Sequence, residues 1–223
     1  MDKCGCDEYA SPIDAGVAQS DRDTYHSNGP DETTRMLLDM IEANSDEGAS
    51  LLDVGGGIGV IDHELLKTNA SSAVLVEASP AYLEVAREEA QKADLLDHIK
   101  IVAGDFVRRA GDIDAADIVT LDRVVCCYPD ADELVSTSAI HAKKLYGLVL
   151  PRDRWYVRWA IKLDNVRWWL KRSAYRAYAH ANTRIDEQLT AAGLVLRSEA
   201  VTPYWRVVLY ARAESEASHR INR

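Results

Sequence analysis

A glycine-rich turn is the part of the chain whose residue types point most directly to chemistry. The apolar stretch 50–54 leads straight into it, and its glycines are Gly55, Gly56, Gly57 and Gly59. Glycine permits positive φ and lets a ligand approach the backbone without an intervening Cβ, while a helix after the turn offers free N–H groups. Such a turn is typical of a site for a nucleotide-like cofactor. A dinucleotide fingerprint would need a further glycine where the chain has Val60 or Asp62, which disfavours NAD and FAD.

Two acidic residues stand where the next apolar stretches end. Glu77 closes the stretch 73–77, and its carboxylate can accept hydrogen bonds from both ribose hydroxyls of an adenosine. After the stretch 98–102, the tripeptide Gly104-Asp105-Phe106 offers a carboxylate for an adenine amino group and an aromatic ring to cover the base. Three successive strand ends would thus supply three parts of one nucleoside site. Their order favours this interpretation over an unrelated surface acid, turn cap and core ring.

These residues need a fold that brings the carboxyl ends of several strands together. Apolar, β-rich stretches recur at 50–54, 73–77, 98–102, 117–121, 146–150, 194–201 and 205–211, and helix-compatible segments lie at 31–43, 60–68, 80–93, 130–143 and 182–192. Strands that alternate with helices are typical of a parallel sheet covered on both faces, and the short link before the last strand favours an antiparallel hairpin. We predict a Rossmann-like α/β fold: a seven-stranded, mainly parallel sheet with one antiparallel strand near the edge and helices on both faces.

Composition narrows the class of protein. With 223 residues, 47% of them hydrophobic, the chain is long enough for one domain, and its net charge of −10 argues against a general nucleic-acid binder. No stretch has the pattern of a signal peptide or approaches the ~20 apolar residues of a membrane span. The cysteines stand as Cys4-x-Cys6 and Cys126-Cys127, too close for a disulfide within either pair. A cytoplasmic protein with reduced thiols and no bound metal is expected.

The motifs together resemble those of class I S-adenosylmethionine-dependent methyltransferases. The resemblance rests on the stretch 53–59, Glu77, the tripeptide 104–106 and the strand 117–122, and it covers roughly residues 31–211. It implies S-adenosyl-L-methionine as the cofactor, with Gly55 to Gly59 around its methionine part, Glu77 and Ala78 at its ribose, and Gly104, Asp105 and Phe106 near its adenine. Asp53 would support the turn and the ammonium end of the cofactor, and the loop that contains Asp122 would close that side.

Within this superfamily, two further patterns are most similar to magnesium-protoporphyrin O-methyltransferases and a group of bacterial relatives. They are the stretch Leu121 to Pro129 and the pattern Tyr25-x-x-x-Gly29-Pro30. The pair Cys126-Cys127 departs from the first pattern, so a porphyrin acceptor stays one option among several.

Three residues are candidates for catalysis. Methyl transfer from a sulfonium is an in-line displacement, so positioning can supply most of the rate and a base is optional. Arg123 could hold an anionic acceptor and Tyr128 could orient or deprotonate it; a surface ion pair and an interface aromatic are the alternatives. Tyr25 lies in residues 1–30, an Asp-, Ser- and Gly-rich arm that is either loose or folded over a site as a lid. Residues 212–223 are predicted to be a disordered tail.

The segment 151–178 is basic and rich in tryptophan. It carries eight basic and two acidic side chains, and its apolar residues at helical spacing include Trp155, Trp159, Leu163, Val166 and Leu170. The favoured interpretation is a helix with its apolar face on the sheet and its basic side chains in water. The alternatives are a substrate lid for a flat, carboxylate-bearing acceptor and shallow attachment to an anionic membrane surface.

The leading hypothesis is an S-adenosylmethionine-dependent methyltransferase that acts on a small anionic or aromatic acceptor, with O-methylation favoured. A non-catalytic protein that binds an adenosyl ligand stays open. So does a thiol-dependent enzyme whose cysteines hold a soft metal or metalloid for methylation, although two small buried side chains and a loose Cys-Gly-Cys are the simpler interpretation. A nicotinamide oxidoreductase is the least favoured choice. Composition and motifs leave the acceptor and the oligomeric state open.

Overall fold

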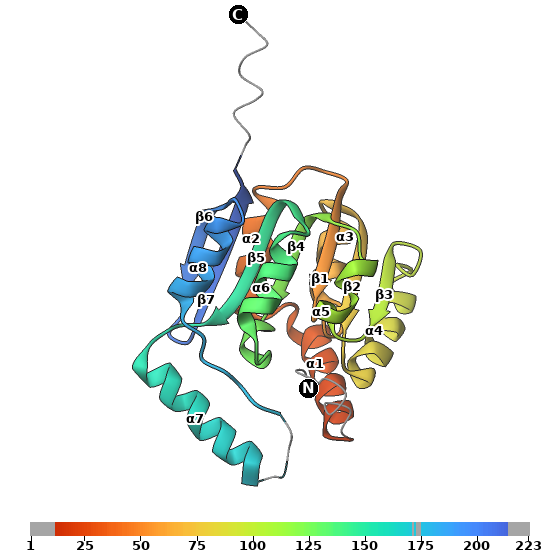
Figure 1. The fold of residues 1–223 in the computed structure, drawn as a ribbon. Coiled ribbons are helices and arrows are strands. Elements are labelled where there is room, and N and C mark those ends of the chain that lie inside the picture. Colours follow the sequence, from red (N-terminus) through yellow and green to blue (C-terminus); the bar gives the residue numbers. More distant parts are fainter. Residues whose placement is uncertain (1–11, 171, 173–174, 214–223) are drawn as a thin grey trace, which may run out of the picture.

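The computed structural model describes residues 12–170, 172 and 175–213. One seven-stranded sheet runs through it, with helices packed on both faces (Figure 1). The strands are β1 (Ala49–Val54), β2 (Ala70–Glu77), β3 (Ile99–Ala103), β4 (Ala116–Asp122), β5 (Ala142–Pro151), β6 (Leu194–Val201) and β7 (Trp205–Arg212). The helices are α1 (Pro12–Asn28), α2 (Glu32–Glu42), α3 (Val60–Lys67), α4 (Pro80–Lys92), α5 (Phe106–Arg109), α6 (Ala131–Ala139), α7 (Trp155–Leu170) and α8 (Asn182–Ala191), with short 3₁₀ turns η2 (Ala110–Asp112) and η3 (Val125–Cys127).

The order of the strands places the ligand end of the sheet. It is β3-β2-β1-β4-β5-β7-β6, and β7 alone is antiparallel to its neighbours. The order reverses between β1 and β4, and open α/β sheets bind ligands beyond the carboxyl ends of the strands at such a switch point. The predicted fold, with its reversed strand next to the edge, is confirmed.

Two hydrophobic cores lie on the two faces of the sheet. Adjacent strand residues point to opposite faces, so Leu51 belongs to one core and Leu52 to the other, and Leu145 and Tyr146 divide in the same way. Helices α6 and α8 cover the face that bears Leu52, and α2, α3 and α4 cover the face that bears Leu51. This double cover explains why the central strands read as nearly continuous apolar stretches.

Residues 12–28 form the helix α1, which the sequence did not predict. It packs along α4: Ala18 is fully buried, the Tyr82 hydroxyl donates to Asp21 at 2.6 Å, and His26 contacts Glu89. The Tyr25 hydroxyl donates to Glu64 of α3 at 2.5 Å. Because only a narrow strip of α1 is buried, its sequence shows little apolar periodicity. The described part of the arm is therefore a docked helix.

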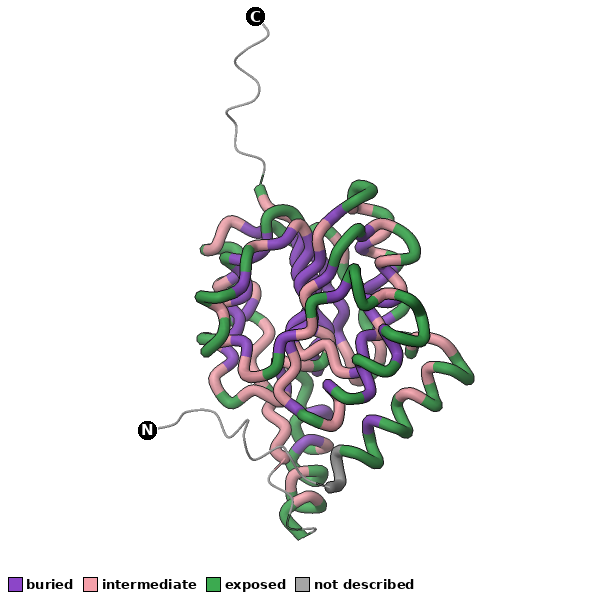
Figure 2. Tube along the Cα trace, turned by 90° about the vertical axis from the view of Figure 1, so that its right-hand side faces the viewer, coloured by how far each residue is buried: buried purple, intermediate pink, exposed green. Residues whose placement is uncertain are grey.

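The favoured interpretation of the segment 151–178 is wrong in its packing. Its regularly spaced residues do form the helix α7, but they face solvent: Trp155 is 75% exposed and Leu170 69% (Figure 2). The opposite side of the helix buries Val157 and Ile161. Residues 175–181, which we call the strap, run along α7 on its domain side (Figure 1). The side of α7 that points to the domain therefore packs on the strap, and the apolar face points away from the sheet.

Some sequence-based predictions lie outside the described residues, namely those on Cys4 and Cys6 and on the tail from residue 214. Within the part that is described, no helix is long and apolar enough to cross a membrane.

Candidate cofactor and acceptor site

The glycine turn after β1 has the backbone that the sequence predicts. Gly55, Gly57 and Gly59 have φ values of 69°, 57° and 85°, where other residues are strained. Gly56 is required for space, since a Cβ there would lie 2.7 Å from Asp53 Oδ2 and 2.8 Å from Leu75 Cγ. The turn is therefore packed tightly from below, while a Cβ on Gly57 would meet only the Tyr82 ring, at 3.6 Å.

Glu77 joins the end of β2 to this turn. Its two carboxylate oxygens accept hydrogen bonds from the backbone N–H groups of Gly57, at 3.1 Å, and Ser79, at 2.7 Å. Its carbonyl accepts from the Gly104 N–H at 2.9 Å. Ala78 is the link between Glu77 and α4. The ends of β1, β2 and β3, which the sequence predicted to form one site, thus lie side by side.

Asp105 and Tyr128 form a pair that the sequence did not connect. Asp105 caps α5 by accepting the Val107 N–H at 3.0 Å, and the Tyr128 hydroxyl donates to the same carboxylate at 3.2 Å. Burial and the neighbouring Asp105 raise the pKa of the Tyr128 phenol. Tyr128 therefore stays protonated at neutral pH and donates to Asp105.

Phe106 is a core residue. Its ring is 4% exposed and packs edge-on against His141, with the ring centres 5.4 Å apart. The ring is therefore not placed to cover an adenine, and the simpler interpretation as a core ring describes it. Only its backbone remains at the strand end.

Asp53 and Asp62 lie buried together beneath the glycine turn. The Thr120 hydroxyl donates to Asp53 at 2.6 Å, whereas neither carboxylate oxygen of Asp62 has a hydrogen-bonding partner among the described residues. Burial raises the pKa of Asp53 to about 7, and burial together with Asp53 raises the pKa of Asp62. Asp53 lies directly against the turn, since a Cβ on Gly56 would meet its carboxylate. No functional or structural role was predicted for Asp62 from the sequence. Its position between the core residues Ile61 and Leu65 of one helix could have indicated a buried acid.

Arg123 is engaged by acidic residues of this chain. It has the unusual φ of 59°, its Nε lies 3.0 Å from Asp122 Oδ1, and it also pairs with Asp31. The Thr34 hydroxyl donates to the other Asp122 oxygen at 2.5 Å. The interpretation of Arg123 as an ion-pair residue describes what is found, and the pair ties the start of α2 to the loop after β4.

Tyr25 lies near the glycine turn but is also engaged. It packs against the small cluster of Ala18, Ile58 and Val85, and burial together with its bond to Glu64 raises the pKa of its phenol. Tyr25, Arg123 and Tyr128 thus each bind acidic partners of their own, and the structure does not gather them into one catalytic cluster.

Two groups that the sequence did not combine meet beside the turn. The Cys127 Sγ lies 3.1 Å from the Tyr175 hydroxyl, and the Cys126 thiol donates to the Arg123 carbonyl at 3.1 Å. A hydrogen bond from Cys126 and another from Tyr175 lower the pKa of Cys127, against the effects of burial and of Glu77. The charge of Glu77 acts on this thiol, which places Cys127 and Glu77 at the same end of the sheet.

The strap holds the loop after β4 in place. The Tyr178 N–H donates to the Cys126 carbonyl at 2.7 Å, and His180 Nε2 lies 3.0 Å from the Tyr128 carbonyl. Burial lowers the pKa of His180, so its neutral ring donates this bond. Asn165 of α7 bonds both backbone groups of Ala177, at 2.7 and 2.8 Å. The strap, held by α7, thus covers the loop that contains Cys127, and we call this covering segment the roof.

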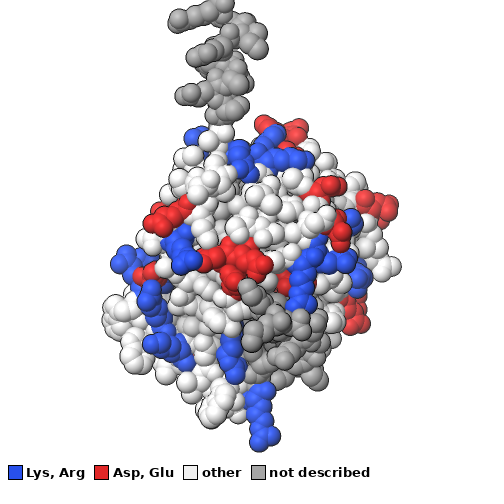
Figure 3. Space-filling model, in the orientation of Figure 1, with Lys and Arg blue, Asp and Glu red and all other residues white. Residues whose placement is uncertain are grey.

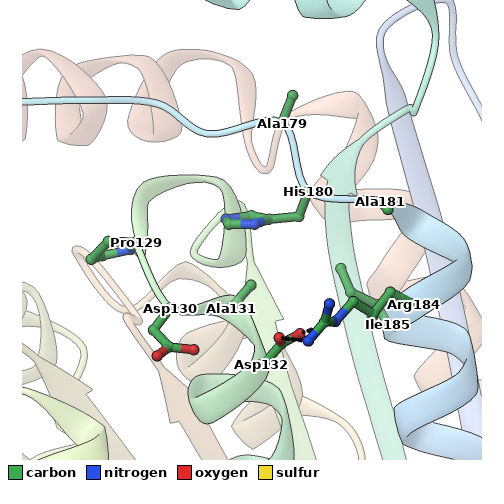
Figure 4. Close-up of a pocket in the computed structure, with 9 residues that line it drawn as sticks. All are labelled: Pro129, Asp130, Ala131, Asp132, Ala179, His180, Ala181, Arg184 and Ile185. Atoms are coloured by element: carbon green, nitrogen blue, oxygen red, sulfur yellow. Dashed lines mark hydrogen bonds and ion pairs between the residues drawn. The ribbon is translucent and has the colours of Figure 1, made fainter.

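The cavity drawn in Figure 4 is a separate feature. It has a volume of about 550 Å³ and lies between the start of α6 and the start of α8, next to His180 and the Arg184–Asp132 ion pair. None of its lining residues belongs to the glycine turn or to the ends of β2 and β3. It therefore does not coincide with the candidate cofactor site.

Comparison with known proteins supports the same fold and family. Residues 18–121 match the methyltransferase small domain family. The chain is 29% identical over 127 residues to the ribosomal protein L11 methyltransferase of Clostridium botulinum, which covers 56% of this chain and 40% of that protein. The chain thus spans less than half the length of the curated relatives it matches.

Two solved structures are similar over most of the chain. One is the magnesium protoporphyrin IX methyltransferase of Synechocystis PCC 6803 with bound SAH, with a TM-score of 0.66, 17% identity and coverage of 90% of this chain and 86% of that one. The other is an O-methyltransferase family 2 protein of Planctomyces limnophilus in complex with apigenin, with a TM-score of 0.67, 18% identity and coverage of 90% and 61%.

The predicted fold is confirmed, and the family match agrees with the predicted superfamily. The sheet order, the glycine turn after β1 and the family match over residues 18–121 agree with one another. The chain thus has the fold of class I S-adenosylmethionine-dependent methyltransferases, and residues 18–121 match the methyltransferase small domain family.

Proposed function

We propose that the glycine turn and the ends of β2 and β3 bind S-adenosylmethionine in this chain. The glycine turn suits this cofactor, because the absence of a Cβ on Gly57 leaves space above the turn. Glu77 lies within hydrogen-bond distance of that glycine. Gly55 to Gly59 would hold the methionine part, Glu77 the ribose hydroxyls and Asp105 the adenine amino group. Asp53 and Asp122 would support the turn and the facing loop.

We further propose that the methyl acceptor is a small molecule and that the accepting atom is oxygen. The observation that carries this proposal is the roof: the strap is bonded to the backbone of Cys126 and Tyr128, so part of the chain itself covers the loop beside the turn. A covered site suits a small acceptor better than a folded protein. A preference for oxygen is supported by the structural neighbour named as an O-methyltransferase with bound apigenin.

The cofactor, when bound, supplies an electrophilic methyl group. The chain then has to hold the acceptor oxygen in line with that group at about 3–3.5 Å and keep water away. Cys127 and Tyr175 would lie next to the acceptor, where they could accept its proton or make a hydrogen bond to it. The bond between Cys127 and Tyr175 and the bond between the strap and the backbone of Cys126 hold both side chains in place. An acceptor carboxylate would need no base, whereas a phenol would gain from one.

A protein acceptor is the second candidate. The matching protein of C. botulinum is named as a ribosomal protein L11 methyltransferase, and the similarity covers 56% of this chain. The match does not extend over the whole of that protein, of which it covers 40%.

Methyl transfer with radiolabelled S-adenosylmethionine distinguishes the two candidates. The chain is incubated with phenols, catechols and carboxylates, including a magnesium porphyrin, and in parallel with purified ribosomal protein L11. We expect label in the organic extract, on an ether or on an ester that releases methanol in alkali. Label only in acid-precipitated L11 would contradict the proposal. Tight cofactor binding without any product would favour a non-catalytic binding protein, and Glu77→Ala serves as the control with impaired cofactor binding.

The same assay tests the thiol-dependent alternative. Within the described residues, no cluster of three or more His, Cys, Asp or Glu side chains could hold a metal ion. Cys126→Ser and Cys127→Ser are expected to retain turnover of an oxygen acceptor, because a serine hydroxyl at position 127 can still make a hydrogen bond. Complete loss of turnover in both, with cofactor affinity unchanged, would restore a role for a sulfur-bound metalloid.

Tyr128→Phe tests the positioning role of Tyr128. Loss of one hydrogen bond to Asp105 is expected to raise the KM for S-adenosylmethionine about three- to tenfold, because such bonds contribute about 0.5–1.5 kcal/mol. The kcat should change less than about twofold, and its pH profile should keep its shape, since the raised pKa keeps this phenol protonated. A large fall in kcat with an unchanged KM would instead identify Tyr128 as a base.

A further inference from the structure

The outer face of α7 is a large apolar surface that no described part of the chain covers. We define it by six residues on one side of the helix, which are Trp155, Trp159, Leu163, Val166, Trp169 and Leu170. The three tryptophans are 75%, 60% and 65% exposed. Most exposed apolar residues of a monomer occur singly, so six on one helix face mark an interaction surface.

This face cannot be turned inward as the structure stands. The opposite side of α7 is already occupied, with Val157 and Ile161 buried and Asn165 bonded twice to the strap. The Tyr156 hydroxyl also donates to the Pro203 carbonyl, at 2.7 Å, which fixes the start of the helix to the loop before β7. Any partner of the outer face therefore comes from outside the described part of the chain.

Basic side chains border the same face. Lys162 lies over the Trp159 ring, 5.5 Å from its centre, and Arg158 pairs with Asp153 at 2.6 Å. Arg154, Lys162 and Arg167 have no carboxylate partner among the described residues. In the view of Figure 3 the surface over α7, at the lower left, is mainly uncharged and basic. This local excess of positive charge contrasts with the net charge of −10 of the chain.

We propose that the outer face of α7 binds the surface of an anionic lipid membrane. A helix of 16 residues is about 24 Å long, and with its charged flank it suits a position flat in the headgroup region. Tryptophan rings prefer that region because one edge is apolar and the N–H can meet water. Lysine and arginine beside the rings meet lipid phosphates, so apolar and charged contacts favour the same orientation.

A second copy of the chain is a poorer occupant of this face. In a two-fold dimer the same patch faces itself, so the basic side chains Arg154, Lys162 and Arg167 of both copies would lie in one interface. Like charges brought together without partners oppose association. An anionic bilayer complements both the rings and the charges.

Vesicle binding by the full chain, without cofactor, tests the proposal. We expect co-sedimentation with vesicles of phosphatidylcholine and phosphatidylglycerol at low salt, at least tenfold weaker binding to phosphatidylcholine alone, and weakening as salt rises. Tryptophan emission should shift to the blue and be quenched by brominated lipids. These readouts need no methyl transfer, so their failure would leave the proposed function untouched.

Two variants and two matched controls locate the binding surface. Trp159→Glu with Trp169→Glu should lower vesicle affinity at least tenfold, whereas Ile140→Glu, at a residue that is 70% exposed at the end of α6, should not. Lys162→Glu with Arg167→Glu should lower the affinity and its salt dependence, and Lys143→Glu should not. The proposal is overturned if anionic vesicles do not bind, if the tryptophan variant binds as well as the parent, or if sedimentation shows a dimer that this variant abolishes.

Discussion

Replacing Gly57 by alanine is expected to weaken S-adenosylmethionine binding about 30-fold or more, which corresponds to about 2 kcal/mol. Gly57 has a φ of 57°, and its N–H donates to Glu77 at 3.1 Å. A Cβ at this position would stand in the space above the turn, where we place the methionine part of the cofactor, and it would strain the backbone by about 1–2 kcal/mol. Isothermal titration with S-adenosylmethionine and its demethylated product measures the change.

Gly48 provides a matched control for backbone strain. It has a φ of 79° in the turn before β1, and nothing lies within 4 Å of a Cβ built on it. Gly48→Ala should therefore lose a similar free energy of unfolding as Gly57→Ala but bind the cofactor within about twofold of the parent, since both replacements force alanine into the left-handed region. If the two variants bind equally well, the turn does not hold the cofactor in the way proposed.

Asp62→Asn is expected to stabilise the fold at pH 8 by about 2 kcal/mol, and to have little effect near pH 4. Asp62 is fully buried and its carboxylate has no hydrogen-bonding partner among the described residues, beside Asp53, whose pKa is raised to about 7. An acid whose pKa is raised by folding favours the native state while it is protonated, and that contribution is lost as the pH rises through the pKa of the folded state. Asparagine stays neutral at every pH and can donate to Asp53.

Urea unfolding from pH 4 to pH 8 measures this effect. The parent should become less stable as the pH rises over this range, to the extent that the Asp53–Asp62 pair dominates, and the Asp62→Asn variant should show a smaller decline. Asp97→Asn, at an exposed residue, is the matched control and should follow the parent. Equal stability of Asp62→Asn and the parent at pH 8 would mean that folding does not raise the pKa of Asp62.

The elements that position the site could be predicted because their signals are local. The glycine turn, Glu77 at the end of its strand and the alternation of strands with helices each depend on neighbours in the sequence. The structure confirms the mainly parallel, seven-stranded sheet with its reversed strand near the edge, and it joins Glu77 to Gly57. The helix α1 was missed because its few buried residues leave too weak a periodic pattern.

The partners of the candidate catalytic residues depend on contacts between distant parts of the chain. Arg123 pairs with Asp31, Tyr128 with Asp105 and Cys127 with Tyr175. No local pattern relates such residues, because their proximity follows from how β4, the strap and α2 are arranged around the sheet. The same is true of Phe106, whose position after a strand does not reveal whether the ring turns toward a ligand or toward His141.

The sequence by itself thus determined the sheet, the glycine turn and the class of cofactor, since periodicity, glycine conformation and strand-end acids are written in short stretches of chain. Only the tertiary structure decided what the side chains around the turn do and which face of α7 meets solvent. Helical spacing shows that Trp155, Trp159 and Leu163 share one face, but what covers that face depends on the strap, which fills the opposite side of the helix.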